Sequence, residues 1–203
     1  MTAPSGDRTL VLATRNDHKL REMRRLFEPA GIAVEGLPPE VELPPEDGAT
    51  FADNALPKAL AVAAATGRPA ISDDSGIEAA VLNGAPGVRS ARYAGVDATD
   101  EENLEKLVAE VPSDSRLRYV CALAYVNPAT GEERVFFGDC RGRMARGRAG
   151  SNGFGYDPVF VPIEGDGRTF AEMTAAEKHA LSHRGRAFRT LADGLRVVAK
   201  LED

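Results

Sequence analysis

The chain has 203 residues, of which 43% are hydrophobic and 28% are charged, as is typical of a soluble globular protein. Its 25 basic and 31 acidic residues give a net charge of −6, which argues against binding to DNA or RNA polymers, because that binding depends on neutralising backbone phosphates. Two cysteines are too few for a disulfide framework or a zinc site. No apolar run is long enough to span a membrane, and residues 1–7 suggest a flexible tail rather than a secretion signal. We therefore expect a cytoplasmic protein.

The N-terminal part of the chain predicts a strand, a helix and a second strand. Residues 9–14 form a short apolar run typical of a buried strand, and Asn16 or Asp17 suits the N-cap of a helix. Apolar residues continue at helical spacing until a stop near Gly31, and residues 32–37 predict the second strand. Such a βαβ unit favours a partly parallel sheet.

A second helix and a third strand are expected after a proline-rich acidic loop. Thr50 and Asp53 have the spacing of a capping box, and Pro57 should kink the helix that follows, because proline lacks the backbone N–H. A short strand over residues 69–72 should then lead into residues 73–76, which have the sequence Asp-Asp-Ser-Gly and would lie at the C-terminal end of that strand.

The C-terminal part predicts a helix, a hairpin and two further helices. After a helix over residues 100–111, strands at 117–126 and 134–140 are joined by the turn sequence NPATG, which predicts an antiparallel hairpin. A glycine-rich loop over residues 150–156 precedes a short helix that begins at a capping box at Thr174, and an apolar stripe predicts the final helix. Because we find no repeat and no linker, we expect the whole chain to form one domain.

Three segments are candidates for binding a ligand. The first is the turn after the first strand, because free backbone N–H groups at a helix N-terminus can bind a phosphate. Thr14 and Asn16 would add side-chain donors there, and Arg15 and Lys19 would add positive charge. The alternative is an ordinary capped turn with basic surface residues.

The second candidate segment is acidic. Asp73 and Asp74 are adjacent carboxylates that a cation would stabilise, and their hard oxygens suit Mg²⁺. Glu46 would be a third oxygen ligand, and Lys58 would neutralise charge during phosphoryl transfer if it lay beside the metal. The alternative is an Asp-rich turn that caps its own backbone, with Glu46 and Lys58 in solvent.

The third candidate consists of two separate stretches with the sequences GFGYD and SHRG. Glycines on both sides of Phe154 would let a flat ligand approach its ring, Asp157 offers hydrogen-bond acceptors, and His183 and Arg184 offer donors. These groups are suited to reading the edge of a nucleobase. The alternatives are a tight turn with a core phenylalanine and a simple helix cap.

Side by side, these segments resemble the inosine triphosphate pyrophosphatase family, the Ham1-like or RdgB-like XTP/dITP diphosphatases. The resemblance runs from about Leu10 to Leu195, with the motifs in the order of the family, and the combination of DDSG, GFGYDP and SHRG is highly specific. The matching motifs are LATRNDHK (12–19), GATFADNALPKA (48–59), ISDDSG (71–76), GAPGVRSARYAG (84–95), GFGYDPVF (153–160) and Glu177-Lys178 with SHRG (182–185).

The resemblance implies a fold and an activity. The fold would be an elongated α/β structure with two lobes, a central mixed β-sheet flanked by helices, and a nucleotide cleft between the lobes. The activity would be Mg²⁺-dependent hydrolysis of ITP, dITP and XTP to the nucleoside monophosphate and pyrophosphate, carried out by a homodimer.

The resemblance also implies roles for individual residues. Asp74, Asp73 and Lys58 would be catalytic, and Asp74 and Glu46 would hold the metal. The residues that would bind the triphosphate and the purine are Thr14, Arg15, Asn16, Lys19, Ser75, Phe154, Gly155, Tyr156, Asp157, Lys178, His183 and Arg184.

Three positions depart from the family pattern. Arg15 stands where a glycine is common, which would strain the backbone if that position needed a positive φ. Pro57 stands where a helix-forming residue is expected. Cys140 stands in place of a tryptophan, which we interpret as a change in packing rather than as a reactive thiol.

Two alternative functions are weighed against this resemblance. A Maf-like pyrophosphatase of modified nucleotides has a related fold but usually carries a Ser-Pro-Arg-Arg turn, which residues 15–17 do not match. A nucleotide-binding sensor without catalytic activity would not need the intact acids Glu46, Asp73 and Asp74.

Overall fold

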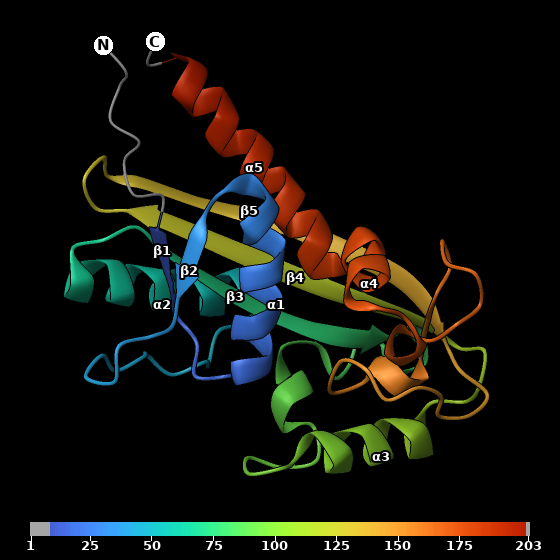
Figure 1. Cartoon of the computed structure of the whole chain (residues 1–203). Helices are drawn as coiled ribbons and strands as arrows, with labels where there is room; N and C mark the ends of the chain where they lie inside the picture. The colour runs from blue at the N-terminus through green and yellow to red at the C-terminus, as the bar shows by residue number, and fades with distance from the viewer. Residues whose placement is uncertain (1–8, 202–203) are drawn as a thin grey trace. The chain divides into compact units, whose positions relative to one another are not determined.

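The computed structural model describes residues 9–201, with side chains described as far as residue 194 (Figure 1). The flexible tail expected at residues 1–7 lies outside these residues. Within them, the strands are β1 (Thr9–Leu12), β2 (Ala33–Glu35), β3 (Ala70–Ala79), β4 (Arg116–Asn127), β5 (Glu132–Met144) and β6 (Phe160–Pro162). The α-helices are α1 (Asp17–Phe27), α2 (Phe51–Thr66), α3 (Asp100–Glu110), α4 (Ala175–Leu181) and α5 (His183–Leu201).

The strands form one mixed sheet in the order β2-β1-β3-β4-β5-β6. β1 pairs in parallel with both β2 and β3, whereas β5 pairs antiparallel with β6. The expected α/β class, with a mixed β-sheet and flanking helices, is therefore confirmed. The nucleotide cleft expected between two lobes stays a prediction.

The chain divides into two compact units, which are described separately below. Unit 1 comprises Met1–Asp73, Leu123–Phe136 and Leu191–Asp203, and unit 2 comprises Asp74–Ala122 and Phe137–Thr190. Each change of unit falls inside a regular element, namely β3, β4, β5 and α5 in turn. The chain thus passes from one unit to the other along strands and a helix rather than through linkers.

Unit 1 contains the βαβ arrangement expected from the sequence. Asn16 caps α1, because its side chain accepts hydrogen bonds from the first-turn backbone N–H groups of His18 and Lys19. The helix buries Met23, Leu26 and Phe27, and one 3₁₀ turn later the chain reverses at Gly31, whose φ of 69° lies in the left-handed region. The two parallel strands beside this helix confirm the prediction for residues 9–37.

The second helix of unit 1 begins at the expected capping box of Thr50 and Asp53. It continues through Pro57 to Thr66 as one helix, so proline does not end it. Small side chains make up much of its buried face, and these are Ala55, Ala59, Val62 and Ala63. Their small size lets the helix lie close to its neighbours.

The strand that follows α2 is longer than the sequence predicts. We expected a strand over residues 69–72 with residues 73–76 at its end, but β3 runs without interruption from Ala70 to Ala79. The Asp-Asp-Ser-Gly sequence is therefore extended backbone inside a strand, so the predicted end of the strand at residue 72 and the alternative of an Asp-rich turn are both wrong. The error arises because this strand is buried on both faces, which removes the alternation that marks a half-exposed strand.

Unit 2 contains the predicted helix α3 and parts of the hairpin of β4 and β5. The NPATG turn is confirmed in unit 1, where the N–H of Gly131 donates to the carbonyl of Asn127 over 2.9 Å. β5 extends beyond the predicted residue 140, because residues 142–144 pair with β6. The short helix α4 begins at the expected capping box at Thr174.

The core of unit 2 is built around aromatic and aliphatic side chains. Tyr119, Phe160 and Phe170 lie at its centre, together with aliphatic residues of α3, β3 and β4. Cys140 belongs to this core and is 1% exposed, and burial raises the pKa of its thiol to about 12. Almost no thiolate is present near neutral pH, which agrees with a packing role for Cys140.

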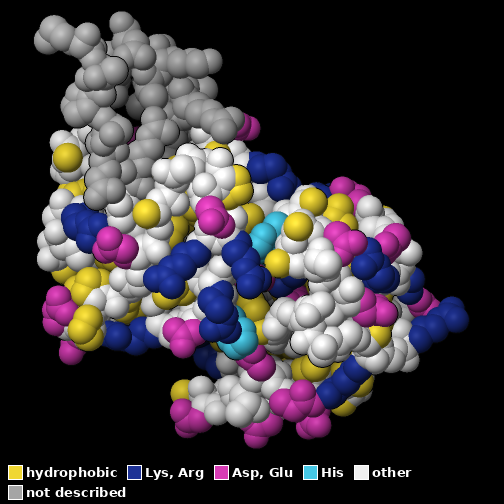
Figure 2. Space-filling model, in the orientation of Figure 1, with side chains coloured by type: hydrophobic (Ala, Val, Ile, Leu, Met, Phe, Trp, Pro, Cys, Tyr) yellow, Lys and Arg dark blue, Asp and Glu magenta, His cyan; other side chains and the backbone are white. Residues whose placement is uncertain are grey.

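The surface carries charges of both signs. Figure 2 shows basic and acidic side chains intermixed over the face in view, with only small apolar areas between them. In the stretch from residue 9 to residue 201, no helix has the combination of length and apolar composition that crossing a membrane requires.

Candidate functional site

The turn between β1 and α1 is built by two of the predicted phosphate-binding residues. Oγ1 of Thr14 accepts a hydrogen bond from the N–H of Asn16 over 3.1 Å. Oδ1 of Asn16 in turn accepts from the N–H groups of His18 at 2.9 Å and Lys19 at 3.2 Å. Both side chains therefore act as acceptors that shape the turn. The hydroxyl proton of Thr14 and the amide N–H₂ group of Asn16 are the donors that these bonds leave for a ligand.

Arg15 makes a different contact from the one that its charge suggests. Its Nη2 donates to the carbonyl oxygens of Val41 at 2.9 Å and Pro39 at 3.3 Å, so it ties the turn to the loop before α2. Arg15 is not among the residues with positive φ, and the backbone here does not require glycine. Its role as a phosphate contact stays a prediction.

Two lysines of unit 1 converge on Asp73. Nζ of Lys19 lies 3.2 Å from Oδ2 of Asp73, and Nζ of Lys58 donates to the Asp73 carbonyl over 3.1 Å. Lys58 also forms a short ion pair with Glu46. Asp73 is 1% exposed, so the Lys19 ammonium provides the positive charge that a buried carboxylate needs. The structure thus brings four predicted residues together, with cations already placed beside the acids.

The next residue, Asp74, begins unit 2 within β3. Successive side chains of a strand point to opposite faces, so the carboxylates of Asp73 and Asp74 do not face each other. Asp74 is 6% exposed, and its Oδ1 accepts a hydrogen bond from the N–H of Ser75 over 3.0 Å. The strand geometry gives the two acids separate surroundings and permits separate roles.

Arg184 connects two of the predicted ligand-binding segments of unit 2. Its Nη2 donates to Oγ of Ser75 over 2.8 Å. Its guanidinium also lies over the Phe154 ring, 5.2 Å from the ring centroid, in a cation–π arrangement. Arg184 therefore links the strand that contains Asp74 to the glycine-rich loop.

Asp157 is a buried residue of that loop that holds its neighbours in place through hydrogen bonds. It is 2% exposed, and its Oδ2 accepts from the N–H of Phe154 at 2.9 Å and from Nζ of Lys178 at 2.7 Å. The Lys178 ammonium also lies 5.2 Å from the centroid of the Phe154 ring. We expected Asp157 to offer acceptors to a base, whereas its Oδ2 already holds Phe154 and Lys178 in place.

The other two predicted loop residues are held in a similar way. The hydroxyl of Tyr156 donates to the carbonyl of Ser90 over 2.7 Å, and burial raises the pKa of Tyr156. The N–H of Gly155 donates to Oδ2 of Asp100 over 3.2 Å, and its φ of 60° favours glycine. The Phe154 ring is only partly buried, which leaves it the loop side chain best placed to stack on a flat ligand.

Tyr119 of β4 also contacts predicted site residues, although the sequence did not indicate it. Its ring stacks on the imidazole of His183, and its hydroxyl lies within 3.4 Å of Oδ1 of Asp157. The only sequence signal was its place in an apolar strand, which is equally typical of a plain core residue.

The two residues predicted to bind a metal belong to different units, since Glu46 lies in unit 1 and Asp74 in unit 2. Among the described residues, no three His, Cys, Asp or Glu side chains gather into a group that could hold a metal ion. Asp74 and Glu46 offer hard carboxylate oxygens, and Mg²⁺ is commonly bound by one or two carboxylates together with water and substrate phosphates. The donor chemistry therefore fits Mg²⁺.

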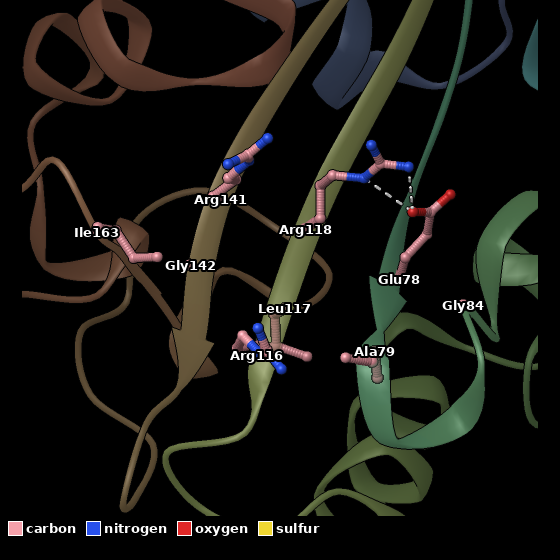
Figure 3. Close-up of a pocket in the computed structure, with 10 residues that line it drawn as sticks. Glu78, Ala79, Gly84, Arg116, Leu117, Arg118, Arg141, Gly142 and Ile163 are labelled. Carbon is pink, nitrogen blue, oxygen red and sulfur yellow. Dashed lines mark hydrogen bonds and ion pairs between the residues drawn. The ribbon is translucent and has the colours of Figure 1, made fainter.

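A separate pocket of unit 2 does not involve the predicted site residues. It has a volume of about 300 Å³ and lies over β3, β4 and β5 (Figure 3). Arg118 donates from both Nε and Nη2 to Oε2 of Glu78, and Arg116 and Arg141 complete its charged lining.

Comparison with known proteins identifies the family. The sequence matches the Ham1 family over residues 10–194. The dITP/XTP pyrophosphatase of Frankia alni is 50% identical over 199 residues, which cover 93% of this chain and 98% of the relative. The dITP/XTP pyrophosphatase of Streptomyces coelicolor is 46% identical over 198 residues, with 92% and 96% covered.

Solved structures agree with the sequence match. A HAM1 protein from Coxiella burnetii superimposes with a TM-score of 0.79 at 41% identity, covering 93% of this chain and 98% of the other. A dITP/XTP pyrophosphatase from Mycobacterium abscessus gives a TM-score of 0.68 at 44% identity, with 90% and 98% covered. With its fold and nearly its whole length matched, this chain belongs to the Ham1 family.

Proposed function

We propose that this chain hydrolyses dITP, ITP and XTP to the nucleoside monophosphate and pyrophosphate, and so removes these nucleotides from the nucleotide pool. The observation that carries the proposal is the pair of lysines that converge on Asp73, next to Asp74, in a member of the Ham1 family. Two ammonium groups that are held at the same residue suit the binding of a charged phosphate chain. The names of the curated relatives supply the substrate class.

The phosphates would be bound by unit 1. Lys19 and Lys58 neutralise charge on the triphosphate, and the backbone N–H groups and side-chain donors of the β1–α1 turn contact its oxygens. Asp73 holds both lysines in place through its carboxylate and carbonyl.

The reaction would be an in-line attack by water on the α-phosphorus. The water oxygen forms the new P–O bond, the bond to the bridging oxygen between the α- and β-phosphorus atoms breaks, and pyrophosphate leaves with that oxygen. Asp74 would accept the proton of the attacking water, as a carboxylate that is not the one paired with Lys19. Asp74 and Glu46 would be the residues that hold Mg²⁺, which would supply charge neutralisation and polarisation of the phosphate oxygens.

The purine would be bound by unit 2. Its ring stacks on Phe154, and Lys178, His183 and Arg184 provide donors for the 6-oxygen. An amino group at that position, as in adenine, would leave these donors unpaired, which typically costs about 1–3 kcal/mol for each buried group.

A pyrophosphate-release assay tests the activity. We expect turnover of ITP and XTP with Mg²⁺, about 10²-fold slower turnover of ATP, and no turnover with a chelator. Failure to hydrolyse any purine triphosphate would leave only binding, as expected of a sensor, whereas a preference for modified pyrimidines would favour the Maf-like alternative.

The role of Asp74 has its own test. Asp74→Asn should lower kcat by about 10²–10⁴-fold, because the amide cannot accept the proton of the attacking water. Asp97→Asn is the matched control, since Asp97 is an exposed residue of unit 2, and it should retain full activity. Circular dichroism checks that both variants are folded. A fully active Asp74→Asn variant would rule out the role given to this residue.

We further propose that the protein acts as a single-domain homodimer in the cytoplasm, the compartment in which a nucleotide pool enzyme meets its substrates. Light scattering coupled to size-exclusion chromatography measures the mass directly. A mass near 43 kDa, twice the 21.6 kDa of the chain, is expected, and a mass of one chain would contradict the dimer.

A further inference from the structure

Tyr119 of β4 is buried among the residues to which base binding is assigned. It is 7% exposed and lies in unit 2. Its ring lies parallel to the imidazole of His183, with 4.5 Å between the ring centroids and 4° between the ring planes. Its hydroxyl lies 3.4 Å from Oδ1 of Asp157. One side chain thus contacts both the first residue of α5 and the residue that organises the glycine-rich loop.

The Tyr119 ring is itself held by the core of unit 2. The Phe160 ring lies 4.7 Å away at an angle of 56°, and the Phe170 ring lies 6.0 Å away at 22°. Such tilted and offset contacts between rings are favourable, and the two phenylalanines are fully buried. The packing of these rings therefore holds the Tyr119 side chain in one orientation.

What Tyr119 fixes is the orientation of groups that would face the purine. A flat stacked contact restricts rotation of the imidazole about its Cβ–Cγ bond, which sets the direction in which the ring nitrogens of His183 point. The contact with Asp157 acts on Lys178 as well, because Oδ2 of Asp157 accepts from Lys178 Nζ over 2.7 Å. Two of the donors assigned to the purine, His183 and Lys178, therefore depend on the Tyr119 side chain, the first through its ring and the second through its hydroxyl.

We propose that Tyr119 is a positioning residue for base selection: it acts through His183 and Asp157 and does not itself contact the substrate. The inference rests on the proposed function, since it concerns how that site discriminates between purines. Small displacements of groups that position a substrate are costly, and a shift of about 1 Å can reduce the rate by about 10²-fold.

The experiment compares kcat/KM for ITP and for ATP in three forms of the full chain. Tyr119→Leu removes the flat ring, and the ratio of the two kcat/KM values should fall about tenfold, mainly because ITP is bound less well. Tyr119→Phe keeps the stacked ring and loses only the hydroxyl contact with Asp157, so its ratio should lie between that of Tyr119→Leu and that of the unmodified chain. If the leucine variant does not fold, Tyr119→Met replaces it, because methionine fills the space without a planar ring.

Tyr125→Leu is the matched control. Tyr125 lies on the same strand, is 6% exposed and belongs to unit 1, so its loss should lower the melting temperature without changing the ratio. A merely structural Tyr119 would behave in the same way and lose activity equally on ITP and ATP, and that result would overturn the proposal.

The outcomes also separate this proposal from the proposed function. If the unmodified chain prefers ITP and Tyr119→Leu keeps that preference, the positioning role is wrong and the function stands. If the unmodified chain hydrolyses no ITP, the function and the positioning role both fail.

A spectroscopic measurement tests the geometry without any substrate. His183 is one of three histidines, so its imidazole resonance can be assigned by substitution. Tyr119→Leu should move this resonance, because the ring current of the stacked tyrosine is lost, whereas Tyr125→Leu should not. An unmoved resonance would overturn the proposal.

Discussion

At the scale of single residues, the ion pair between Asp157 and Lys178 gives the sharpest prediction. Both side chains are about 95% buried or more, and their charged atoms are 2.7 Å apart. Asp157→Asn keeps the shape but removes the negative charge beside a buried ammonium. We expect the free energy of unfolding to fall by about 3–5 kcal/mol, because removing one partner leaves the other charge poorly compensated.

Urea denaturation followed by circular dichroism measures this loss. Asp166→Asn is the control, since Asp166 forms an exposed ion pair with Arg168 and its replacement should leave the midpoint nearly unchanged. Equal midpoints for Asp157→Asn and the unmodified chain would show that the ion pair contributes nothing to the stability of the fold. A lower affinity for ITP should accompany the loss of stability, because the same carboxylate holds Phe154 and Lys178.

The types of residue in the candidate site could be predicted from the sequence, but many of their contacts could not. Asp73, Lys19 and Lys58 come together in the structure although they are far apart in the chain. The contact of Arg15 with the Val41 carbonyl could not be foreseen, since a backbone acceptor leaves no mark in a sequence. Tyr119 could not be foreseen either, because its role depends on contacts with side chains that are distant in the sequence.

At the scale of elements, the close approach of α5 to β5 depends on Gly138. A Cβ atom there would lie 2.2 Å from the carbonyl oxygen of His183 and 2.4 Å from the N of Ala187, and both are backbone atoms that cannot move aside alone. Gly138→Ala should therefore push the helix start away from the strand. We expect a loss of stability of about 1–3 kcal/mol, together with weaker selection of ITP over ATP, because His183 would move.

Thermal denaturation and the kcat/KM ratio for ITP and ATP measure the two effects. Gly147→Ala is the matched control, because Gly147 lies in the same unit and a Cβ atom added there has nothing within 4 Å. If both variants melt at the temperature of the unmodified chain, helix and strand do not pack as closely as these distances require.

Elements with a local signal were predicted well, and those that depend on distant contacts were not. Asn16, Thr50 and Thr174 mark helix starts through hydrogen bonds within one turn, so the sequence contains the whole signal. β3 has no such signal, because its length depends on strands that pair with it on both sides. Its residues 73–76 combine acids with a glycine, a composition that elsewhere favours a turn.

At the scale of the whole molecule, the important feature is where the chain changes units. All four changes fall inside β3, β4, β5 or α5. A strand or helix is stabilised by hydrogen bonds along its length, so melting one half of the element removes neighbours from the other half. Independent domains are normally joined by flexible linkers, where few contacts cross.

We therefore expect the two units to unfold as one. Hydrogen exchange measured by mass spectrometry in increasing urea should give the same midpoint for peptides of α2 in unit 1 and of α3 in unit 2. Asp157→Asn, which changes unit 2 alone, should lower the midpoint of the α2 peptides as much as that of the α3 peptides. Because global unfolding exposes both units at once, two separate midpoints, or an effect confined to unit 2, would mean that the units fold independently and that the single-domain prediction is wrong.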